Sequence, residues 1–147
     1  MAELHNDTIE ARARQLVEEF ALFDDWMEKY EYLIELGKSL PPLEPEYKTE
    51  AFRIHGCQSQ VWIRPEFRDG RVYFKGDSDA LITKGLVALL IRVLSGQPPE
   101  AIVNARLDFL DEIGLKAHLS PTRKNGLAAM IEQIRRYAQA YLQASRN

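Results

Sequence analysis

The chain has 147 residues, of which 46% are hydrophobic and 28% charged, a composition typical of a globular protein. Its formal net charge is −3 and its basic residues are scattered, which argues against nucleic acid as the main partner. The sequence has no signal-peptide pattern, and its longest aliphatic run, residues 86–91, is too short to cross a bilayer. We therefore expect a cytoplasmic protein without a membrane partner, folded as one domain over residues 1–147.

Two helices are predicted before the first prolines. Apolar residues recur at helical spacing over 9–20, and a capping box is expected at residues 7–10. A second helix is expected to begin at Asp24-Asp25 and to end at Gly37, which completes a helical hairpin. Three prolines within residues 40–45 then predict an extended connector, because proline fixes the backbone and lacks a donor.

A small antiparallel sheet is predicted next. Apolar and polar residues alternate over 52–55, which indicates the end of a strand, and another strand is expected at 61–64 after a turn. Asp69-Gly70 predicts a hairpin that folds residues 67–75 back on this strand, since glycine accepts the positive φ of such turns.

The remaining chain predicts further helices. Residues 77–79 are expected to cap a helix over 81–93, and Pro98-Pro99-Glu100 to begin a short helix. Residues 107–119 give no definite prediction. Ser120-Pro121 is expected to start the last helix. The order of helices, strands and helices predicts an α+β fold, with a small antiparallel β-sheet packed by flanking α-helices.

Cys57 is the only cysteine, and it lies at the predicted turn in the motif RIHGCQSQVW. Gly56 precedes it, and the polar Gln58, Ser59 and Gln60 follow, whereas a cysteine kept for packing prefers apolar neighbours. Backbone amides in a tight turn can face an anion such as a thiolate or a persulfide sulfur. Without this context, a lone cytosolic cysteine is more often a small buried hydrophobe.

Other residues depart from local rules or add charge near the turn. His55 and Arg53 add basic side chains near the turn. In the expected strand both lie on the same face, and the alternative is that this face is simply exposed to solvent. Arg123 and Lys124 lie in the first turn of the last helix, where the dipole disfavours each cation by about 0.3 to 1 kcal/mol. A functional anion nearby would explain the position of these two cations. The alternative is that both side chains lie in solvent, which screens the unfavourable interaction with the helix dipole. A glycine inside a helix, such as Gly85, destabilises it by roughly 1 kcal/mol relative to alanine. Its presence predicts that another backbone packs closely there, and we expect this backbone to be the cysteine turn.

Three kinds of thiol protein stay in competition on these residues. Cys57 with His5, His55 and His118 gives no zinc spacing, so we expect no metal site and no cofactor on this chain. Besides a sulfur carrier, Cys57 could be the nucleophile of a hydrolase with His118 or His55 as base. The third hypothesis is a non-catalytic adaptor with an inert cysteine.

Four segments, WMEKYEYLIELGKSLP, GCQSQVW, GDSDALITKG and SPTRKNGLAAMI, resemble in order and separation the SufE/CsdE family of sulfur-acceptor proteins. The resemblance covers nearly the whole chain and implies a SufE-like fold. It implies that Cys57 accepts persulfide sulfur from a SufS-type or CsdA-type cysteine desulfurase, which carries pyridoxal phosphate, and stimulates that enzyme. Sulfur would then pass to an iron–sulfur scaffold of the SufBCD type. The chain would be a transpersulfidation partner rather than a stand-alone enzyme.

The resemblance also bears on single residues. Arg123 falls where the family has an arginine near the site, and we expect it to assist transfer. Asp77 and Asp79 are expected to act first as helix caps and second in partner contacts. The sequence leaves open whether the chain forms a homodimer. Supporting or partner-contact roles are expected for His55, Gly56, Gln58, Ser59, Gln60, Asp77 and Asp79.

The apolar Val61-Trp62-Ile63 predicts shelter for the Cys57 sulfur. We expect an apolar pocket formed by this strand and by the helix that bears Gly85. Burial there would raise the pKa of the thiol, so a partner would have to move the turn over residues 56–60 outward to activate it.

Overall fold

Two antiparallel strands, β1 (Val61–Arg68) and β2 (Arg71–Ser78), form the sheet and pair along their whole length. The computed structural model describes residues 7–146. Asp69 and Gly70 connect the strands with φ values of 51° and 77°, so the predicted hairpin is confirmed.

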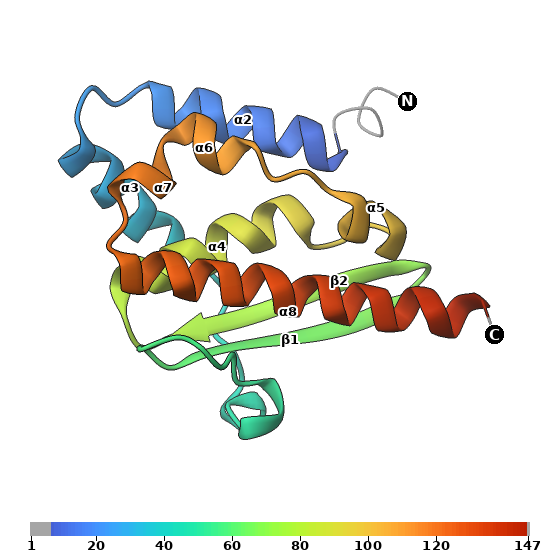
Figure 1. Cartoon of the computed structure of the whole chain (residues 1–147). Coiled ribbons are helices and arrows are strands. Elements are labelled where there is room, and N and C mark those ends of the chain that lie inside the picture. The colour runs from blue at the N-terminus through green and yellow to red at the C-terminus, as the bar shows by residue number, and fades with distance from the viewer. Residues whose placement is uncertain (1–6, 147) are drawn as a thin grey trace.

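Helices supply most of the fold, and α4 lies at its centre. Figure 1 shows α8 crossing in front of the hairpin, with α4 between α8 and α2. Helix α4 packs against α2, α3, α8 and β2, and its side chains are apolar and buried on most sides. The helices are α2 (Ile9–Ala21), α3 (Trp26–Lys38), α4 (Leu81–Leu94), α5 (Pro99–Asn104), α6 (Phe109–Ile113), α7 (Leu115–His118) and α8 (Pro121–Arg146), with 3₁₀ turns η1 (Pro45–Tyr47) and η2 (Glu50–Phe52).

The predicted α+β fold is confirmed, since the buried apolar side chains of the helices and the hairpin form one core. Residues 107–119, for which the sequence gives no definite prediction, contain α6 and α7. The chain changes direction between these two helices at Gly114, where φ is 94°. No helix within residues 7–146 combines the length and the apolar character needed to cross a bilayer.

Helices α3 and α4 pack backbone against backbone at two glycines. A Cβ on Gly85 would overlap the carbonyl oxygen of Leu33 and lie 2.7 Å from its Cγ, and one on Gly37 would lie 2.8 Å from the Gly85 nitrogen. The close approach predicted from Gly85 exists, but the prediction that the cysteine turn makes it was wrong. Gly37 does not end α3, which continues to Lys38, because this glycine serves the same close contact.

The predicted strand over residues 52–55 was also wrong. Residues 50–52 form a 3₁₀ turn, which the side chain of Glu50 supports by accepting a hydrogen bond from Arg53 Nη1 at 3.2 Å. Arg53 forms one isolated β-bridge with Trp62, and the Ile54 amide donates a hydrogen bond to the carbonyl of Val61 at 2.8 Å. This local side-chain contact stabilises the turn, and four alternating residues were too few to exclude it.

Two of the predicted helix caps are confirmed. Asp25 and Ser120 each accept a hydrogen bond from the amide three residues on, as predicted. Asp7 does not cap α2. Its carboxylate pairs with Arg12 at 2.6 Å, and Thr8, one residue later, is the N-cap instead.

Candidate functional site

Cys57 lies in a turn that is closed at its base, as predicted. The hydrogen bond between the Ile54 amide and the Val61 carbonyl joins the two ends of residues 54–61. Gly56 has a φ of 93°, a conformation that glycine adopts at little cost, and the chain reverses there. The buried side chains of Ile54 and Val61 anchor this base in the core, so the residues between them are the part that can move.

Asp79 fastens the C-terminal end of the cysteine turn. Its carboxylate accepts a hydrogen bond from the Gln60 amide at 3.0 Å, and its own amide donates to the Gln60 carbonyl at 3.2 Å. This pair of hydrogen bonds ties the turn to the segment between β2 and α4. The Asp79 side chain and the Gln60 backbone therefore have a structural role that is independent of any partner.

The predicted helix caps over residues 77–79 are wrong. Strand β2 extends through Ser78, and the N-cap of α4 is Ala80, which has no side-chain oxygen to offer. Asp77 instead pairs with Lys48 at 2.9 Å and with Lys84 at 3.3 Å. Burial alone would raise the pKa of its carboxyl, but the two lysines and a hydrogen bond from the Ser78 amide outweigh burial and hold the pKa below the ordinary value.

The sulfur of Cys57 rests against the first turns of α8. The thiol is half-buried and lies 3.6 Å from the carbonyl oxygen of Gly126, to which it can donate a weak hydrogen bond. A Cβ on Gly126 would lie 3.4 Å from the sulfur, so the missing side chain leaves room for it. Burial raises the pKa of the Cys57 thiol, as predicted, and the group is therefore protonated near neutral pH.

A pocket of about 240 Å³ surrounds the thiol between the cysteine turn and the starts of α4 and α8. The hydroxyl groups of Ser59, Ser120 and Thr122 and the guanidinium of Arg123 give it a polar side, and Leu86 is one of its apolar residues. Its lining is Cys57, Gln58, Ser59, Thr83, Leu86, Ser120, Thr122, Arg123, Gly126 and Met130. None of these residues is a histidine or a carboxylate.

The predicted apolar shelter is right in part. Helix α4, which bears Gly85, contributes Thr83 and Leu86 to the pocket. The strand over residues 61–63 does not line it, and its Val61 and Ile63 side chains are wholly buried in the core. Helix α8 forms that wall instead, and it makes the pocket more polar than predicted.

Several predicted site residues lie elsewhere. The His55 side chain is 75% exposed and its Nε2 lies 3.7 Å from Glu50, on the outside of the turn. His118 stacks on Trp26 with ring centroids 3.9 Å apart and is not among the residues that line the pocket. Lys124 also points away from the thiol, although it follows Arg123 directly. Sequence reasoning missed Gly126, whose signal was a glycine inside a predicted helix.

In the part of the chain that the structure describes, no three His, Cys, Asp or Glu side chains lie close enough together to hold a metal ion. The site is thus defined by one protonated, half-buried thiol with hydroxyl groups and a cation around it. Such a site suits a protein that carries a group on cysteine, displayed on an α+β domain.

The SufE family model, described as "SufE: Fe-S metabolism associated domain", matches residues 14–138, and the chain belongs to this family. It is 39% identical over 135 residues to the "Uncharacterized SufE-like protein R01000" of Rhizobium meliloti, covering 88% of this chain and 96% of that protein. It is 40% identical over 128 residues to "SufE-like protein 1, chloroplastic/mitochondrial" of Arabidopsis thaliana, covering 86% of this chain but 34% of that longer protein.

The fold is also found in a solved structure. The solution structure of a hypothetical protein from Thermus thermophilus is similar with a TM-score of 0.74 and 25% identity, covering 90% of this chain and 96% of that one. The predicted family and fold are therefore confirmed. Members of the SufE family are generally sulfur-transfer partners of cysteine desulfurases, and a desulfurase is the partner class that the family implies.

Proposed function

We propose that Cys57 accepts sulfane sulfur from the persulfide of a SufS-type or CsdA-type cysteine desulfurase, stimulates that enzyme, and passes the sulfur to a SufBCD-type iron–sulfur scaffold. The observation that carries the proposal is the single thiol held in a small pocket beside Arg123, without an acid or a base among the lining residues. A free cysteine suits the reducing cytoplasm, where we place the exchange.

The transfer needs no oxidant or cofactor on this chain. The Cys57 thiolate attacks the outer sulfur of the protonated donor persulfide. The sulfur–sulfur bond of the donor breaks, and the donor cysteine leaves as a thiolate with the electron pair. A new sulfur–sulfur bond at Cys57 keeps the sulfane oxidation state. Because the chain has one cysteine, no second thiol of its own can attack this persulfide and release sulfide.

The burial of Cys57 makes partner binding part of the mechanism. Desolvation raises the pKa of the thiol while the turn is in place. We infer that the desulfurase draws residues 56–60 outward, where water and the Arg123 cation can favour the thiolate. The resting pocket would protect the persulfide between the two transfers.

The lining of the pocket counts against a hydrolase. Hydrolysis through cysteine requires a base within hydrogen-bond reach of the nucleophile. His55 lies outside the pocket near Glu50, and the imidazole of His118 is stacked on Trp26. An inert adaptor is disfavoured by the polar side of the pocket, since a cysteine kept for packing needs no hydroxyl groups around it.

The rate of alkylation by iodoacetamide tests the sheltered thiol. Because burial raises the pKa of Cys57, the folded protein should react slowly, and its rate should still rise with pH where that of the urea-unfolded chain has levelled off. A catalytically inactive desulfurase that leaves the thiol accessible should raise the rate at neutral pH. Identical pH profiles for the folded and unfolded chains would contradict a sheltered thiol.

Asp79 gives this experiment a matched pair of variants. Asp79→Ala should speed alkylation about fivefold, the factor that corresponds to a hydrogen bond worth about 1 kcal/mol, whereas Asp79→Asn keeps an acceptor and should restore much of the slow rate. Asp77→Ala is the control, because Asp77 pairs with Lys48 and Lys84 and makes no contact with the turn that would hold it closed. Equal rates for the Asp77 and Asp79 alanine variants would argue against the turn as the moving part.

Arg123→Ala should slow sulfur transfer from the desulfurase to Cys57 by about tenfold or more, the loss expected for one hydrogen bond to a charged group. Single-turnover transfer of labelled sulfur measures the effect. Lys124→Ala is the control, since it removes the neighbouring cation, which lies outside the Cys57 pocket. Both variants should gain slightly in thermal stability, because each removes a cation from the first turn of α8. Equal transfer rates for the two would remove Arg123 from the mechanism.

A further inference from the structure

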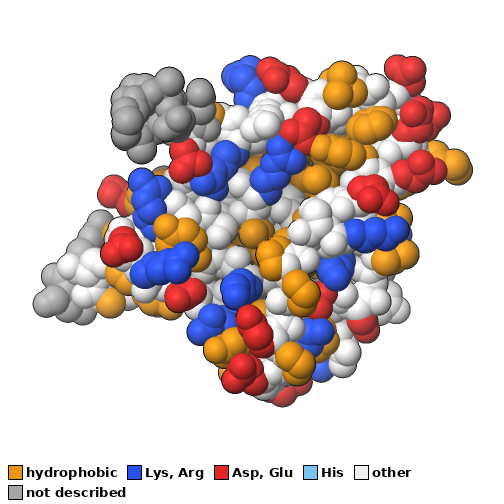
Figure 2. All heavy atoms as spheres, turned by 180° about the vertical axis from the view of Figure 1, so that it is seen from behind, with side chains coloured by type: hydrophobic (Ala, Val, Ile, Leu, Met, Phe, Trp, Pro, Cys, Tyr) orange, Lys and Arg blue, Asp and Glu red, His pale blue; other side chains and the backbone are white. Residues whose placement is uncertain are grey.

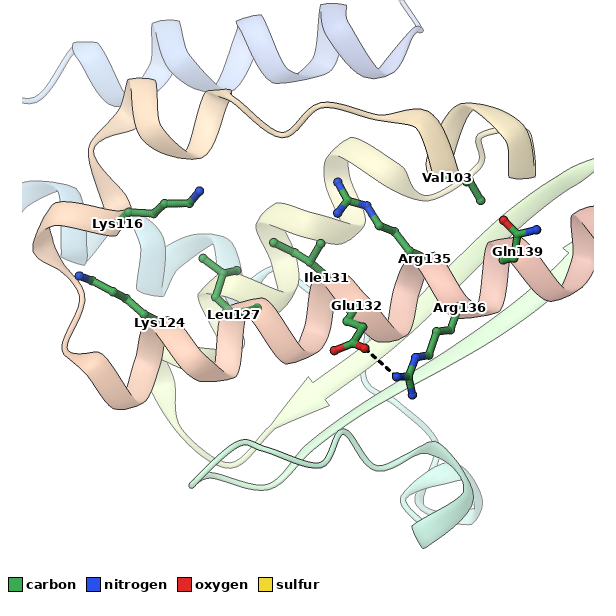
Figure 3. Close-up of a pocket in the computed structure, with 10 residues that line it drawn as sticks. Val103, Lys116, Lys124, Leu127, Ile131, Glu132, Arg135, Arg136 and Gln139 are labelled. Carbon is green, nitrogen blue, oxygen red and sulfur yellow. Dashed lines mark hydrogen bonds and ion pairs between the residues drawn. The ribbon is translucent and has the colours of Figure 1, made fainter.

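A larger hollow lies on the face of α8 opposite to Cys57. At 100° per residue, the α8 residues that line the thiol pocket and those that line this hollow point in nearly opposite directions. The hollow has a volume of about 600 Å³ and runs between α8 and α5, with α7 at one end (Figure 3). Its apolar floor comes from Val103, Leu127, Ala128 and Ile131. We refer to it as the α8 groove.

The rim of the α8 groove is basic. Lys116, Lys124, Arg135 and Arg136 line it, and Glu132 is the one acid among the lining residues, so four cations face one carboxylate. Figure 3 places Lys116 and Lys124 at one end of the groove, with Arg135 and Arg136 farther along α8. The local excess is therefore +3, although the whole chain has a net charge of −3.

The opposite face of the protein differs. Figure 2 shows that face, where Lys and Arg side chains are interspersed with Asp and Glu side chains. The lining of the α8 groove, in contrast, has one acid among its five charged residues.

Part of the rim charge is not balanced within the protein. Arg136 pairs with Glu132 at 2.6 Å, and the exposed Lys116 lies 3.5 Å from Asp111. Arg135 donates to a backbone carbonyl, and for Arg135 and Lys124 the described residues supply no carboxylate within ion-pair distance. Lys124 also lies at the end of α8 that disfavours cations. An acidic ligand in the groove would explain the position of Lys124, which the Cys57 site does not.

We propose that the α8 groove binds an amphipathic acidic helix of another protein. From Lys124 to Gln139 the groove follows α8 for about 22 Å, which matches a helix of about 15 residues. Apolar side chains of that helix, spaced three and four residues apart, would occupy the floor, and its Glu or Asp side chains would face the basic rim. The mouth of the Cys57 pocket would stay open on the other face of α8.

A second copy of this chain does not fit the groove. The large exposed hydrophobic side chains of the described residues are Leu22, Met27, Phe67 and Leu81. They lie on separate elements, and Met27 alone lies on a helix with exposed acidic side chains, namely α3. No described helix therefore presents the series of apolar anchors that the floor requires.

Other classes of ligand fit less well. The lining has no aromatic ring on which a nucleic-acid base could stack. A flat bilayer cannot enter a concave groove. The apolar floor in turn adds contacts for a helix that phosphate groups could not use.

Fluorescence anisotropy of a labelled synthetic peptide tests the proposal. The probe is a helix of about 15 residues with leucines at i, i+3, i+4 and i+7 and glutamates elsewhere. We expect saturable binding that weakens as salt is raised, and binding at least about tenfold weaker for a peptide of the same composition in scrambled order. Two control ligands are a peptide in which lysine replaces each glutamate and a single-stranded oligonucleotide. Neither should displace the labelled peptide from the protein.

Three charge variants locate the peptide on the protein. Lys124→Glu and Ala128→Glu should each weaken binding about tenfold, whereas Lys38→Glu, an exposed reversal on α3, should leave it unchanged. Lys124→Glu places an acid in the first turn of α8 and should melt no lower than the native protein, so its loss of binding would not reflect unfolding. Sulfur loading of Cys57 from the desulfurase should be unaffected in all three, which separates this proposal from the function of the thiol.

Any of four results from the binding experiments overturns the proposal. These are no saturable binding, equal affinity for the ordered and scrambled peptides, equal losses in Lys38→Glu and Lys124→Glu, and displacement of the peptide by the oligonucleotide. Sedimentation that shows self-association of the native protein, lost in Lys124→Glu, would assign the groove to a second copy of the chain and would also contradict it.

Discussion

Cys57→Ser should abolish sulfur acceptance and stimulation of the desulfurase while leaving the fold intact. A hydroxyl cannot form a persulfide, so no residual transfer is expected. The oxygen is smaller than sulfur and can still donate to the Gly126 carbonyl, and the site is half-buried. The thermal midpoint should therefore stay close to that of the native protein. Turnover of the desulfurase, measured as alanine formed from cysteine, gives the result.

Ser59→Ala is the matched control for the thiol variant. Ser59 lies two residues from Cys57 in the same turn and lines the same pocket, but in the proposed exchange it neither accepts nor donates sulfur. It should stimulate the desulfurase nearly as well as the native chain. Full stimulation by Cys57→Ser would show instead that binding alone activates the enzyme, and the inert adaptor would then be the better account.

Gly85→Ala should destabilise the protein by about 2 kcal/mol. A methyl group there would overlap the carbonyl oxygen of Leu33, and relief requires α3 to move as a whole, because the clash is with backbone. Overpacking costs about 1 to 3 kcal/mol, sometimes more, and the better helix propensity of alanine returns at most about 1 kcal/mol. Urea unfolding at constant m-value gives the free energy, and the thermal midpoint should fall by about 4 to 8 °C.

Gly126→Ala is the control, since it makes the same change inside a helix but meets the movable Cys57 side chain at 3.4 Å rather than backbone. It should unfold at a similar or slightly higher urea concentration than the native protein. Equal stability of Gly85→Ala and the native chain would show that α3 and α4 can separate freely, which the described packing does not allow.

Several local features of the fold could be predicted from the sequence, whereas the tertiary contacts could not. The Asp69-Gly70 hairpin and the Ser120 cap depend on backbone conformations that neighbouring residues determine. The need for a close contact at Gly85 was visible, because a glycine inside a helix has a cost. Its partner was not, since α3 reaches that point only through packing. The strand predicted over residues 52–55 does not form, because the hydrogen bond from Arg53 to Glu50 stabilises a turn there and four alternating residues are a weak strand signal.

The candidate site divides in the same way. Cys57 was found because it is the only thiol and lies between a glycine and polar residues, and the turn followed from the same neighbours. The wall of the pocket comes from α8, about 70 residues later in the chain, so Gly126 and Thr122 were missed. His118 was a candidate base until the structure placed it against Trp26.

Arg123 and Lys124 illustrate the limit of arguments from sequence spacing. Both are cations at the unfavourable end of a helix, and the sequence suggests the same explanation, a nearby anion, for both. Successive residues of a helix point about 100° apart, so Arg123 lines the thiol pocket and Lys124 the α8 groove. Two adjacent cations thus belong to two sites, and the structure was needed to separate them.

The most direct test of the central claim is the intact mass of the protein after incubation with a cysteine desulfurase and L-cysteine. The account predicts a gain of one sulfur atom, located on the peptide that contains Cys57 and removed by a reducing thiol. The persulfide on the desulfurase itself, detected in the same sample, shows that sulfur was available. No gain under that condition, or a gain that persists in Cys57→Ser, would contradict the account.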